Sequence, residues 1–413
     1  HPDFKIGKSG IEKSFENYLR GKAGLKHLEV DAYGYKVRDL QLNSSKTEVP
    51  GGNLKLTLNI ELQKYTMNLL KDKQASVTVI DIETGDIVAM VSTPSFNAND
   101  FVVGISNEKW DSLVTNSGKP LQNKAITNQY PPGSIFKIMV ALAALENGYN
   151  PKQTFHCSGK VKLGRRYYHC WKEKGHGTLD LEGAIKHSCN IYFYLLSREI
   201  GIDNIADMAF QYGLGSKVDL PLSEQNAGFI PNKEWKRKAL KEPWVVGDTF
   251  NSAIGQGYVQ TTNIQLATLS AKIASNLDVK PRLIIDDGKK VEFKPMNIKY
   301  ENLSLIHRGM YKVVNEPKGT AYYSRIRNKK YAMSGKTGTS QVVSLEHTQD
   351  KEFKEIDFNK RNHALFMGYA PSLKPKFAIS VIVEHGGSGS GAAAPLGRLI
   401  LYKAQKIWEK KKL

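Results

Sequence analysis

The sequence predicts an α+β fold in which helices cover a sheet. The prediction rests on the order of the elements, because strand-like segments come early, helical segments fill the middle and strand-like segments return near the end. The length of 413 residues is a second observation, since it exceeds what one hydrophobic core usually serves. We therefore expect one large domain and a smaller one.

The smaller domain is expected at the N-terminus. Residues 1 to about 50 are polar, and the Pro-Gly-Gly turn at residues 50–52 closes them off. Apolar periodicity becomes dense after this turn, where residues 54–58 alternate like a strand and residues 60–70 have helical spacing. The sequence therefore predicts a domain boundary near Gly52.

Two pairs of strands are expected in the large domain. Residues 76–82 and 86–92 are apolar runs joined by a Glu-Thr-Gly turn signal, and residues 363–370 and 377–384 form the second pair. The segment 395–412 has helical character. The charged segment 346–361 and the Gly/Ser segment 386–391 are expected to be flexible loops.

The first motif with chemical potential is Ser134-Ile-Phe-Lys137. The preceding Tyr-Pro-Pro-Gly sequence cannot be helical, whereas the following residues are apolar over a helical length. Ser134 is therefore expected to open a buried helix, with its backbone N–H available to an oxygen that becomes negative. Lys137 lies one turn along, and it can accept the serine proton if burial and nearby positive charge keep it neutral.

Two more short motifs follow, Ser-Cys-Asn at 188–190 and Lys-Thr-Gly at 336–338. The last one lies in a glycine-containing strand pattern that is typical of an edge strand, to which a peptide could add by main-chain hydrogen bonds. Lys336 and the hydroxyls of Thr337 and Thr339 offer a pocket for a terminal carboxylate. A glycine-rich surface hairpin would also explain this motif alone, but the order and context of all three make them specific.

Together the motifs resemble those of the class B penicillin-binding proteins, monofunctional D,D-transpeptidases of the bacterial cell wall, and most closely the elongation or rod-shape type. Residues 7–24 resemble the segment ahead of the catalytic domain in that family, and residues 253–262 resemble its approach to the cleft. The resemblance implies the penicillin-binding/serine-transpeptidase fold. That fold has an antiparallel sheet covered by helices, an all-helical part and, here, a small N-terminal pedestal remnant.

The resemblance also divides the chain. It implies that residues 1–51 are the C-terminal part of a truncated pedestal or dimerisation domain. Residues 52–413 would be the transpeptidase domain, with a Cys/His insertion at about 154–189. The implied function is cross-linking of peptidoglycan stem peptides during cell elongation, without a catalytic cofactor and with β-lactams as acylating inhibitors.

Roles for the motif residues follow from the same resemblance. The serine at 134 would attack a D-alanyl-D-alanine stem peptide, with the lysine at 137 as base, and the serine and asparagine of the second motif would relay protons and hold the substrate amide. Backbone N–H groups at positions 134 and 339 would form the oxyanion hole. The implied catalytic residues are Ser134, Lys137, Ser188, Asn190 and Lys336, and the implied substrate-binding residues are Thr337, Gly338 and Thr339.

All three cysteines of the chain lie close together in the sequence, with a histidine among them. Three thiolates and one imidazole complete a tetrahedral set that is typical of structural zinc, although the spacing differs from that of a zinc finger. Because protein ligands would fill all four coordination positions, the set argues against a catalytic zinc and predicts a structural one. The proposed ligands are Cys157, Cys170, His176 and Cys189.

Other interpretations of the cysteines stay open at this point. An oxidising compartment would favour a Cys157–Cys170 disulfide with Cys189 unpaired, and three unconnected buried thiols are a further alternative. If Cys189 is a metal ligand, its side chain points away from the cleft that Ser188 and Asn190 face. Metal binding would then orient Ser188 and Asn190. Histidines that could substitute as ligands are His156, His169 and His187.

The formal charge of +19 raises the question of a nucleic-acid partner. The lysines are scattered and no nucleic-acid-binding signature accompanies them, so we predict a solvated basic surface or attraction to an anionic membrane face or wall polymer. The resemblance implies other partners, which are peptidoglycan stem peptides, β-lactams, a membrane glycosyltransferase of the shape, elongation, division and sporulation family, and a rod-shape scaffold protein. Residues 7–24 are the expected docking region.

No apolar run approaches the roughly 20 residues that a membrane span needs. Relatives in the resembled family are tethered by an N-terminal membrane helix. The resemblance therefore implies a truncated piece of a protein that is anchored at the periplasmic face of the cytoplasmic membrane.

Rival interpretations use the same three motifs. A division-type transpeptidase, a D,D-carboxypeptidase or a serine β-lactamase would share them, although we place no class A type deacylating glutamate by motif. A β-lactam sensor domain without catalysis is a non-enzymatic alternative. The lifetime of a penicillin adduct separates a transpeptidase from an enzyme that hydrolyses it.

Overall fold

A five-stranded antiparallel sheet forms the centre of the computed structural model, which describes residues 6–40, 45–102, 104–286, 291–343 and 355–412. The strand order is β4-β3-β11-β10-β9, so strands from both ends of the sequence pair in the middle of the sheet. This arrangement confirms the predicted α+β fold and its antiparallel sheet. The strands are β3 (Ala75–Asp81), β4 (Ile87–Thr93), β9 (Ser334–Ser340), β10 (His363–Ala370) and β11 (Phe377–Val383).

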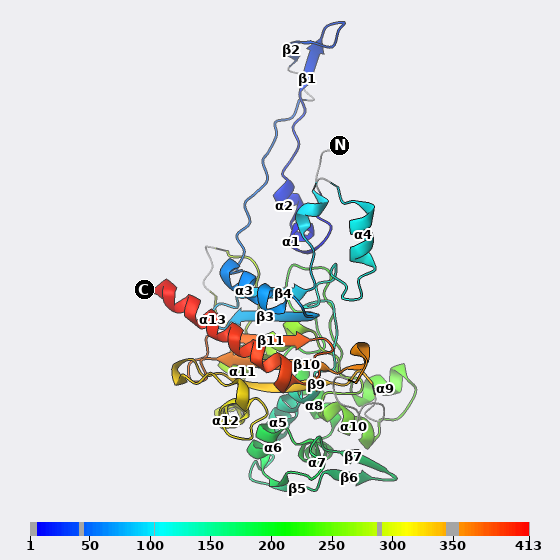
Figure 1. The fold of residues 1–413 in the computed structure, drawn as a ribbon, viewed down its shortest axis with the longest axis vertical. Coiled ribbons are helices and arrows are strands. Elements are labelled where there is room, and N and C mark those ends of the chain that lie inside the picture. Colours follow the sequence, from blue (N-terminus) through cyan, green and yellow to red (C-terminus); the bar gives the residue numbers. More distant parts are fainter. Residues whose placement is uncertain (1–5, 41–44, 103, 287–290, 344–354, 413) are drawn as a thin grey trace.

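Helices cover both faces of the sheet (Figure 1). The C-terminal helix α13 (Ala394–Lys412) packs on β10 and β11, with α3 (Ile60–Leu70) beside it. Helix α11 (Asn263–Ser275) packs against β3, β10 and β11 and is buried along almost its whole length. The Asn263 amide donates hydrogen bonds to the backbone carbonyls of Ser76 and Ser380, which ties the start of α11 to two adjacent strands.

An all-helical part adjoins the sheet at the β9 edge, and helix α5 (Lys137–Glu146) lies at its centre. Nine of the ten α5 residues are buried, as expected for a helix that is apolar on all sides. Helix α12 joins the two parts of the domain, since it packs on both α5 and β9. The other helices are α4 (Asn107–Val114), α6 (Leu181–His187), α7 (Asn190–Ile200), α8 (Ile202–Gln211), α9 (Lys233–Ala239), α10 (Val246–Ala253) and α12 (Tyr300–Asn315).

The segment between α5 and α6 contains two small antiparallel ribbons. Strand β5 (Phe155–Cys157) pairs with β8 (Gly177–Leu179), and between them β6 (Lys160–Leu163) pairs with β7 (Arg166–His169). These ribbons bring the cysteines of the insertion close together.

The N-terminal segment projects from the body of the molecule (Figure 1). Helices α1 (Gly10–Ser14) and α2 (Glu16–Arg20) precede a hairpin of β1 (His27–Val30) and β2 (Lys36–Leu40). Among the described residues, no helix combines the length and the apolar character that crossing a membrane would require.

Two expectations from the sequence are wrong in detail. Residues 54–58 do not form a regular strand, because they pair with a non-strand segment at a single bridge between Leu56 and Ile284. The Gly/Ser segment 386–391 leads into an ordered π-helical turn, Gly389–Ala393, instead of a flexible loop. The other loop prediction, 346–361, falls largely outside the described residues.

The turn is ordered because Gly389 packs against the sheet, where a Cβ atom would lie 2.3 Å from the Leu365 carbonyl oxygen and 2.4 Å from that of Gly338. We therefore expect Gly389→Ala to lower the free energy of unfolding by about 1 to 3 kcal/mol, as overpacking typically does. Gly391→Ala is the matched control, since its Cβ would meet only the Ser388 hydroxyl, at 3.1 Å. Thermal unfolding measures both variants, and equal stabilities would contradict the packing argument.

Candidate active site

Ser134 lies in a tight 3₁₀ turn, Gly133–Ile135, and the regular α-helix α5 begins only at Lys137. The expectation that Ser134 itself opens the α-helix is therefore corrected by one turn. The reason is local, because Gly133 has a φ of +55° and Phe136 has the dihedral angles of a 3₁₀ turn, and such turns often lead into α-helices. Ser134 remains half-buried at the helix entrance.

At Gly133, the turn before Ser134 lies against the backbone of the strand that contains the Lys-Thr-Gly motif. A Cβ atom on Gly133 would lie 2.4 Å from the Thr339 carbonyl oxygen and 2.9 Å from the Thr339 nitrogen. Gly133 also donates a backbone hydrogen bond of 2.9 Å to Gly255, while the Gln256 amide donates one of 3.0 Å to the Thr339 carbonyl. Only glycine permits so close an approach of the two backbones. The contact places the backbone of Ser134 next to that of Thr339.

The Ser-Cys-Asn motif forms the junction between helices α6 and α7. Ser188 ends α6 in the left-handed conformation, with a φ of +53°, which costs a non-glycine residue about 1 to 2 kcal/mol. Cys189 caps the start of α7, and Asn190 is the first residue of that helix. The side chains of Ser188 and Asn190 face the first motif while that of Cys189 points to the cysteine cluster, as the sequence predicted.

Lys137 and Lys336 meet at Ser188. The Lys137 ammonium nitrogen Nζ lies 2.7 Å from Asn190 Oδ1, 2.8 Å from the Ser188 carbonyl oxygen and 3.4 Å from Ser188 Oγ. Lys336 Nζ lies 2.8 Å from the same Ser188 Oγ. One residue from each of the three motifs therefore shares a single hydrogen-bond network.

Burial changes the charge of both lysines. Each is fully buried, and among the described residues neither forms an ion pair with a carboxylate. Burial lowers the pKa of Lys137 to about 8, an effect that the nearby cysteines partly oppose. Burial, and then the charge of Lys137, hold the pKa of Lys336 well below its usual value. A neutral amine near pH 8 can accept a proton, so Lys137 has the properties of a general base.

The hydroxyl of Ser134, the predicted nucleophile, is not held by a hydrogen bond to any described residue. It lies one helical turn before Lys137, whose amine is neutral for part of the time at pH 8. A serine, a base and an adjacent pair of backbone N–H groups are the components of acyl transfer.

Strand β9 is an edge strand, as predicted, because β10 is the only strand of the described residues that pairs with it. Its Thr337 hydroxyl lies 2.7 Å from that of Thr320, which fixes one polar group on the strand. At Gly338 a Cβ atom would lie 2.6 Å from the Pro132 carbonyl oxygen, so the strand passes close to the Ser134 turn. The unpaired edge can accept an extended peptide beside Ser134.

The cysteines and His176 converge on one point beside this network. The three thiols are free, so the structure contains none of the disulfides considered above. The ligand atoms of Cys157, Cys170, His176 and Cys189 all lie within 4.8 Å of one another. Hydrogen bonds from Cys189 and His176 lower the pKa of the Cys170 thiol, although burial opposes them, and a metal ligand must be such a thiolate.

The spacing of these atoms fits a tetrahedral metal ion. His176 Nδ1 lies 3.6 Å from Cys157 Sγ and 3.5 Å from Cys170 Sγ. Zinc bonds of about 2.0 to 2.3 Å give tetrahedral edges of about 3.5 to 3.8 Å between nitrogen and sulfur ligands. The four side chains therefore have the chemistry of a structural metal site, and the two distances from His176 agree with it.

The Cys/His insertion also contacts the hydrogen-bond network of Lys137, Ser188 and Asn190 directly. The Asn190 amide nitrogen donates a hydrogen bond of 3.2 Å to the carbonyl of His169, the residue before Cys170. The indole N–H of Trp171, the residue after Cys170, lies 3.1 Å from the carbonyl oxygens of both His187 and Ser188. His169 and Trp171 therefore form hydrogen bonds with Asn190 and Ser188, the two residues that also bind the Lys137 amine.

Comparison with known proteins agrees with this geometry. The sequence matches the penicillin binding protein transpeptidase domain over residues 75–402 and the penicillin-binding protein dimerisation domain over residues 1–56. The chain belongs to the penicillin-binding protein transpeptidase family. This result confirms the resemblance and the serine-transpeptidase fold that it implied.

Several relatives of this penicillin-binding protein are named peptidoglycan D,D-transpeptidases. It is 37% identical to the peptidoglycan D,D-transpeptidase MrdA of Salmonella typhimurium over 97% of its own length, and it spans 66% of that relative. Among solved structures it resembles PBP2 of Helicobacter pylori in complex with MreC, with 33% identity, a TM-score of 0.85 and coverage of 99% of this chain and 73% of that one. Pseudomonas aeruginosa PBP2 in complex with WCK 5153 matches with 34% identity, a TM-score of 0.81 and coverage of 96% and 81%.

The contacts of some residues that shape the site of this penicillin-binding protein cannot be predicted from the sequence. Trp171 and Thr320 carry no motif, and the position of Trp171 beside Cys170 was the one available signal. Gln256 lies in a segment that the resemblance had indicated, but its contact with Thr339 depends on the folded backbone.

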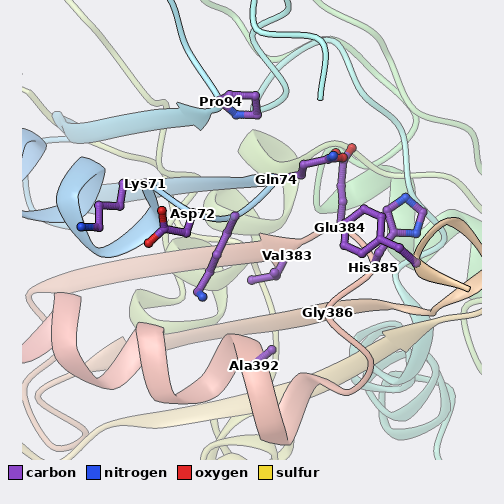
Figure 2. Close-up of a pocket in the computed structure, with 11 residues that line it drawn as sticks. Lys71, Asp72, Gln74, Pro94, Val383, Glu384, His385, Gly386 and Ala392 are labelled. Carbon is purple, nitrogen blue, oxygen red and sulfur yellow. The ribbon is translucent and has the colours of Figure 1, made fainter. Parts of the chain in front are cut away.

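A cavity of about 450 Å³ lies away from the three motifs, near the start of β3 and the end of β11 (Figure 2). Glu384 borders it and accepts hydrogen bonds of 2.7 Å from the Tyr130 hydroxyl and 3.2 Å from the Asn128 amide. Burial and the charge of Glu384 raise the pKa of Tyr130, so this hydroxyl stays protonated and donates. Glu384 therefore fixes the chain four residues before Ser134.

Proposed function

We propose that this chain is the catalytic part of an elongation-type peptidoglycan D,D-transpeptidase, which cross-links stem peptides through an acyl-enzyme and is acylated by β-lactams. The observation that carries the proposal is the buried network of Lys137, Ser188 and Lys336 beside the unpartnered hydroxyl of Ser134. Family membership and relatives named peptidoglycan D,D-transpeptidase support it.

In the first step the Ser134 oxygen attacks the carbonyl carbon of the penultimate D-alanine. Lys137 accepts the hydroxyl proton, and the N–H groups of Ser134 and Thr339 stabilise the oxyanion. The peptide bond to the terminal D-alanine breaks, and that D-alanine leaves as an amine after it receives a proton. Ser188 relays this proton, because its hydroxyl contacts both lysines.

In the second step an amine from a neighbouring stem peptide attacks the ester. Its proton returns to the Ser134 oxygen through Lys137, and the new amide is the cross-link. Asn190 holds Lys137 and the substrate amide, while Lys336, Thr337 and Gly338 receive the peptide and its carboxylate at the edge of β9. A β-lactam instead acylates Ser134 as in the first step: its ring C–N bond breaks, and the leaving amine stays attached to the acyl group.

We also propose that Cys157, Cys170, His176 and Cys189 hold a structural zinc ion. The ion would cross-link an insertion that has few apolar residues, and it would take no part in the acyl transfer. The contacts of His169 and Trp171 with the catalytic network support a positioning role for the insertion.

The wider organisation is part of the proposal. Residues 1–51 would be the end of a pedestal domain and residues 52–413 the transpeptidase domain. A membrane anchor outside this chain would hold the enzyme at the periplasmic face. The H. pylori PBP2 structure includes MreC, which supports a scaffold partner here, and residues 7–24 would dock that scaffold or a glycosyltransferase.

Ser134→Ala is expected to reduce covalent labelling by fluorescent penicillin to background, since the attacking oxygen is removed. Ser158→Ala, which changes an exposed serine of the insertion, should label like the parent protein. Gel fluorescence and peptide mapping provide the measurement. Persistent labelling of Ser134→Ala would identify another nucleophile, and a parent adduct that turns over within minutes would favour a hydrolase.

The acylation rate should depend on the protonation of Lys137. Its pKa is lowered to about 8, so the neutral base accumulates as the pH rises. The second-order rate constant for penicillin should therefore increase from pH 6 and level off above about pH 8. Lys137→Arg, which stays protonated, should be slower by about 10² to 10⁴. A flat profile between pH 6 and 9 would exclude Lys137 as the base.

Loss of the metal should slow acylation without abolishing it. We expect Cys170→Ser or a strong chelator to lower the rate at least about tenfold, because the insertion no longer positions Ser188 and Asn190. His156→Ala is the matched control, since this histidine of the same insertion lies outside the cluster. Zinc content per chain is measured in parallel, and unchanged labelling of demonstrably metal-free protein would remove zinc from the account.

A further inference from the structure

The paired strands β6 and β7, with the turn between them, form a two-stranded ribbon, residues 160–169, that we call the basic ribbon. It contains the basic residues Lys160, Lys162, Arg165 and Arg166 and no acidic residue. All four are exposed, and none forms an ion pair in the part of the chain that the structure describes. The ribbon therefore carries four basic side chains within ten residues.

The two faces of the basic ribbon differ in chemistry. Val161, Leu163 and Tyr168 are partly buried and pack against the hydrophobic core, which fixes the inner face. The strand register places Lys162 opposite Tyr167 and Lys160 opposite His169, so these residues share the outer face. That face is therefore held toward solvent by the packing beneath it.

An aromatic ring lies among the charges of the outer face. Lys160 Nζ is 5.1 Å and Lys162 Nζ 6.0 Å from the centre of the Tyr167 ring, which is itself exposed. The ring keeps both ammonium groups close together on one surface. An aromatic surface flanked by cations suits a ligand with both apolar faces and carboxylates, such as a glycan strand with peptide stems.

The ribbon begins at the catalytic cleft. The carbonyl of His169, at the end of β7, accepts the hydrogen bond from the Asn190 amide. From His169 to Arg166 strand β7 extends away from the cleft over about 10 Å, at 3.3 Å per residue. Figure 1 shows the ribbon at the opposite end of the molecule from the β1–β2 hairpin, so the two surfaces can bind different partners.

We propose that the basic ribbon binds the carboxylates of a peptidoglycan strand while one stem peptide of that strand occupies the cleft beside Ser134. The inference rests on the proposed function, and it adds a binding surface for the polymer outside the reacting peptide. Charge complementarity carries it, because the unpaired Lys160 and Lys162 share the outer face of a ribbon that leads from the cleft, and the unpaired Arg165 lies in its turn. Contacts between exposed charges are weak and screened by salt, so the ribbon acts through several contacts together.

The test compares two triple variants of the 413-residue chain. Lys160→Gln/Lys162→Gln/Arg165→Gln removes the charge of the ribbon, and Lys217→Gln/Lys294→Gln/Lys374→Gln removes three exposed, unpaired lysines elsewhere. The probe is a soluble, uncross-linked peptidoglycan strand with pentapeptide stems, and its affinity is measured at low salt by fluorescence anisotropy. These binding measurements use a Ser134→Ala background, so that no acyl-enzyme forms.

We expect the ribbon variant to bind the strand about tenfold more weakly and the control to change less than about twofold. Strands whose carboxylates have been converted to amides should bind the unsubstituted ribbon as weakly as native strands bind the ribbon variant. With Ser134 present, both triple variants should be acylated by penicillin at the parent rate, because penicillin does not reach the ribbon.

Equal affinity of the ribbon variant and the control for the native strand would overturn the proposal, as would undiminished binding of amidated strands. Loss of binding to anionic phospholipid vesicles with strand binding intact would assign the ribbon to a membrane surface instead. Failure of the parent protein to react with penicillin would overturn the proposed function itself, and this result is distinguishable because it does not involve the ribbon.

Discussion

Two buried lysines that meet at one serine hydroxyl are the constraint on which the rest of the site depends. Lys137 and Lys336 approach Ser188 Oγ at 3.4 and 2.8 Å, and no carboxylate among the described residues neutralises them. Two ammonium groups cannot share so small a buried space without a large cost, so at least one amine is held neutral. In the mechanism that we propose, a neutral Lys137 amine is the base for the serine nucleophile, and burial is what keeps this amine neutral.

The fold exists, in this view, to bring three distant segments to that point. Helix α5 supplies Lys137, the α6–α7 junction supplies Ser188 in a strained left-handed conformation, and strand β9 supplies Lys336. Glycines at 133 and 255 let the backbones touch, and the Cys/His insertion holds the junction from outside through His169 and Trp171. The strain at Ser188 is thus offset by contacts from separate elements.

The sequence predicted the elements that depend on local patterns, which are helix 60–70 and the two strand pairs. The three motifs and their order could also be recognised from the sequence. It also predicted that Ser188 and Asn190 face one way and Cys189 the other, since neighbouring side chains must diverge. It failed where long-range packing decides. Residues 54–58 alternate like a strand but find only one bridging partner, and Gly389 is required by the contact with Gly338 rather than by flexibility. The role of Trp171 depends on a carbonyl 17 residues away, which no local pattern reveals.

The most direct test of this account is the titration of the Lys137 side chain itself. Protein labelled with ¹³C at the lysine ε-carbon can be followed by NMR from pH 6 to 11, and a Lys137→Met variant assigns the resonance. The account predicts a midpoint near pH 8, where burial places the pKa of Lys137. A midpoint at the ordinary lysine value of about 10.4 would mean that the buried amine stays charged, and the central claim would then be wrong.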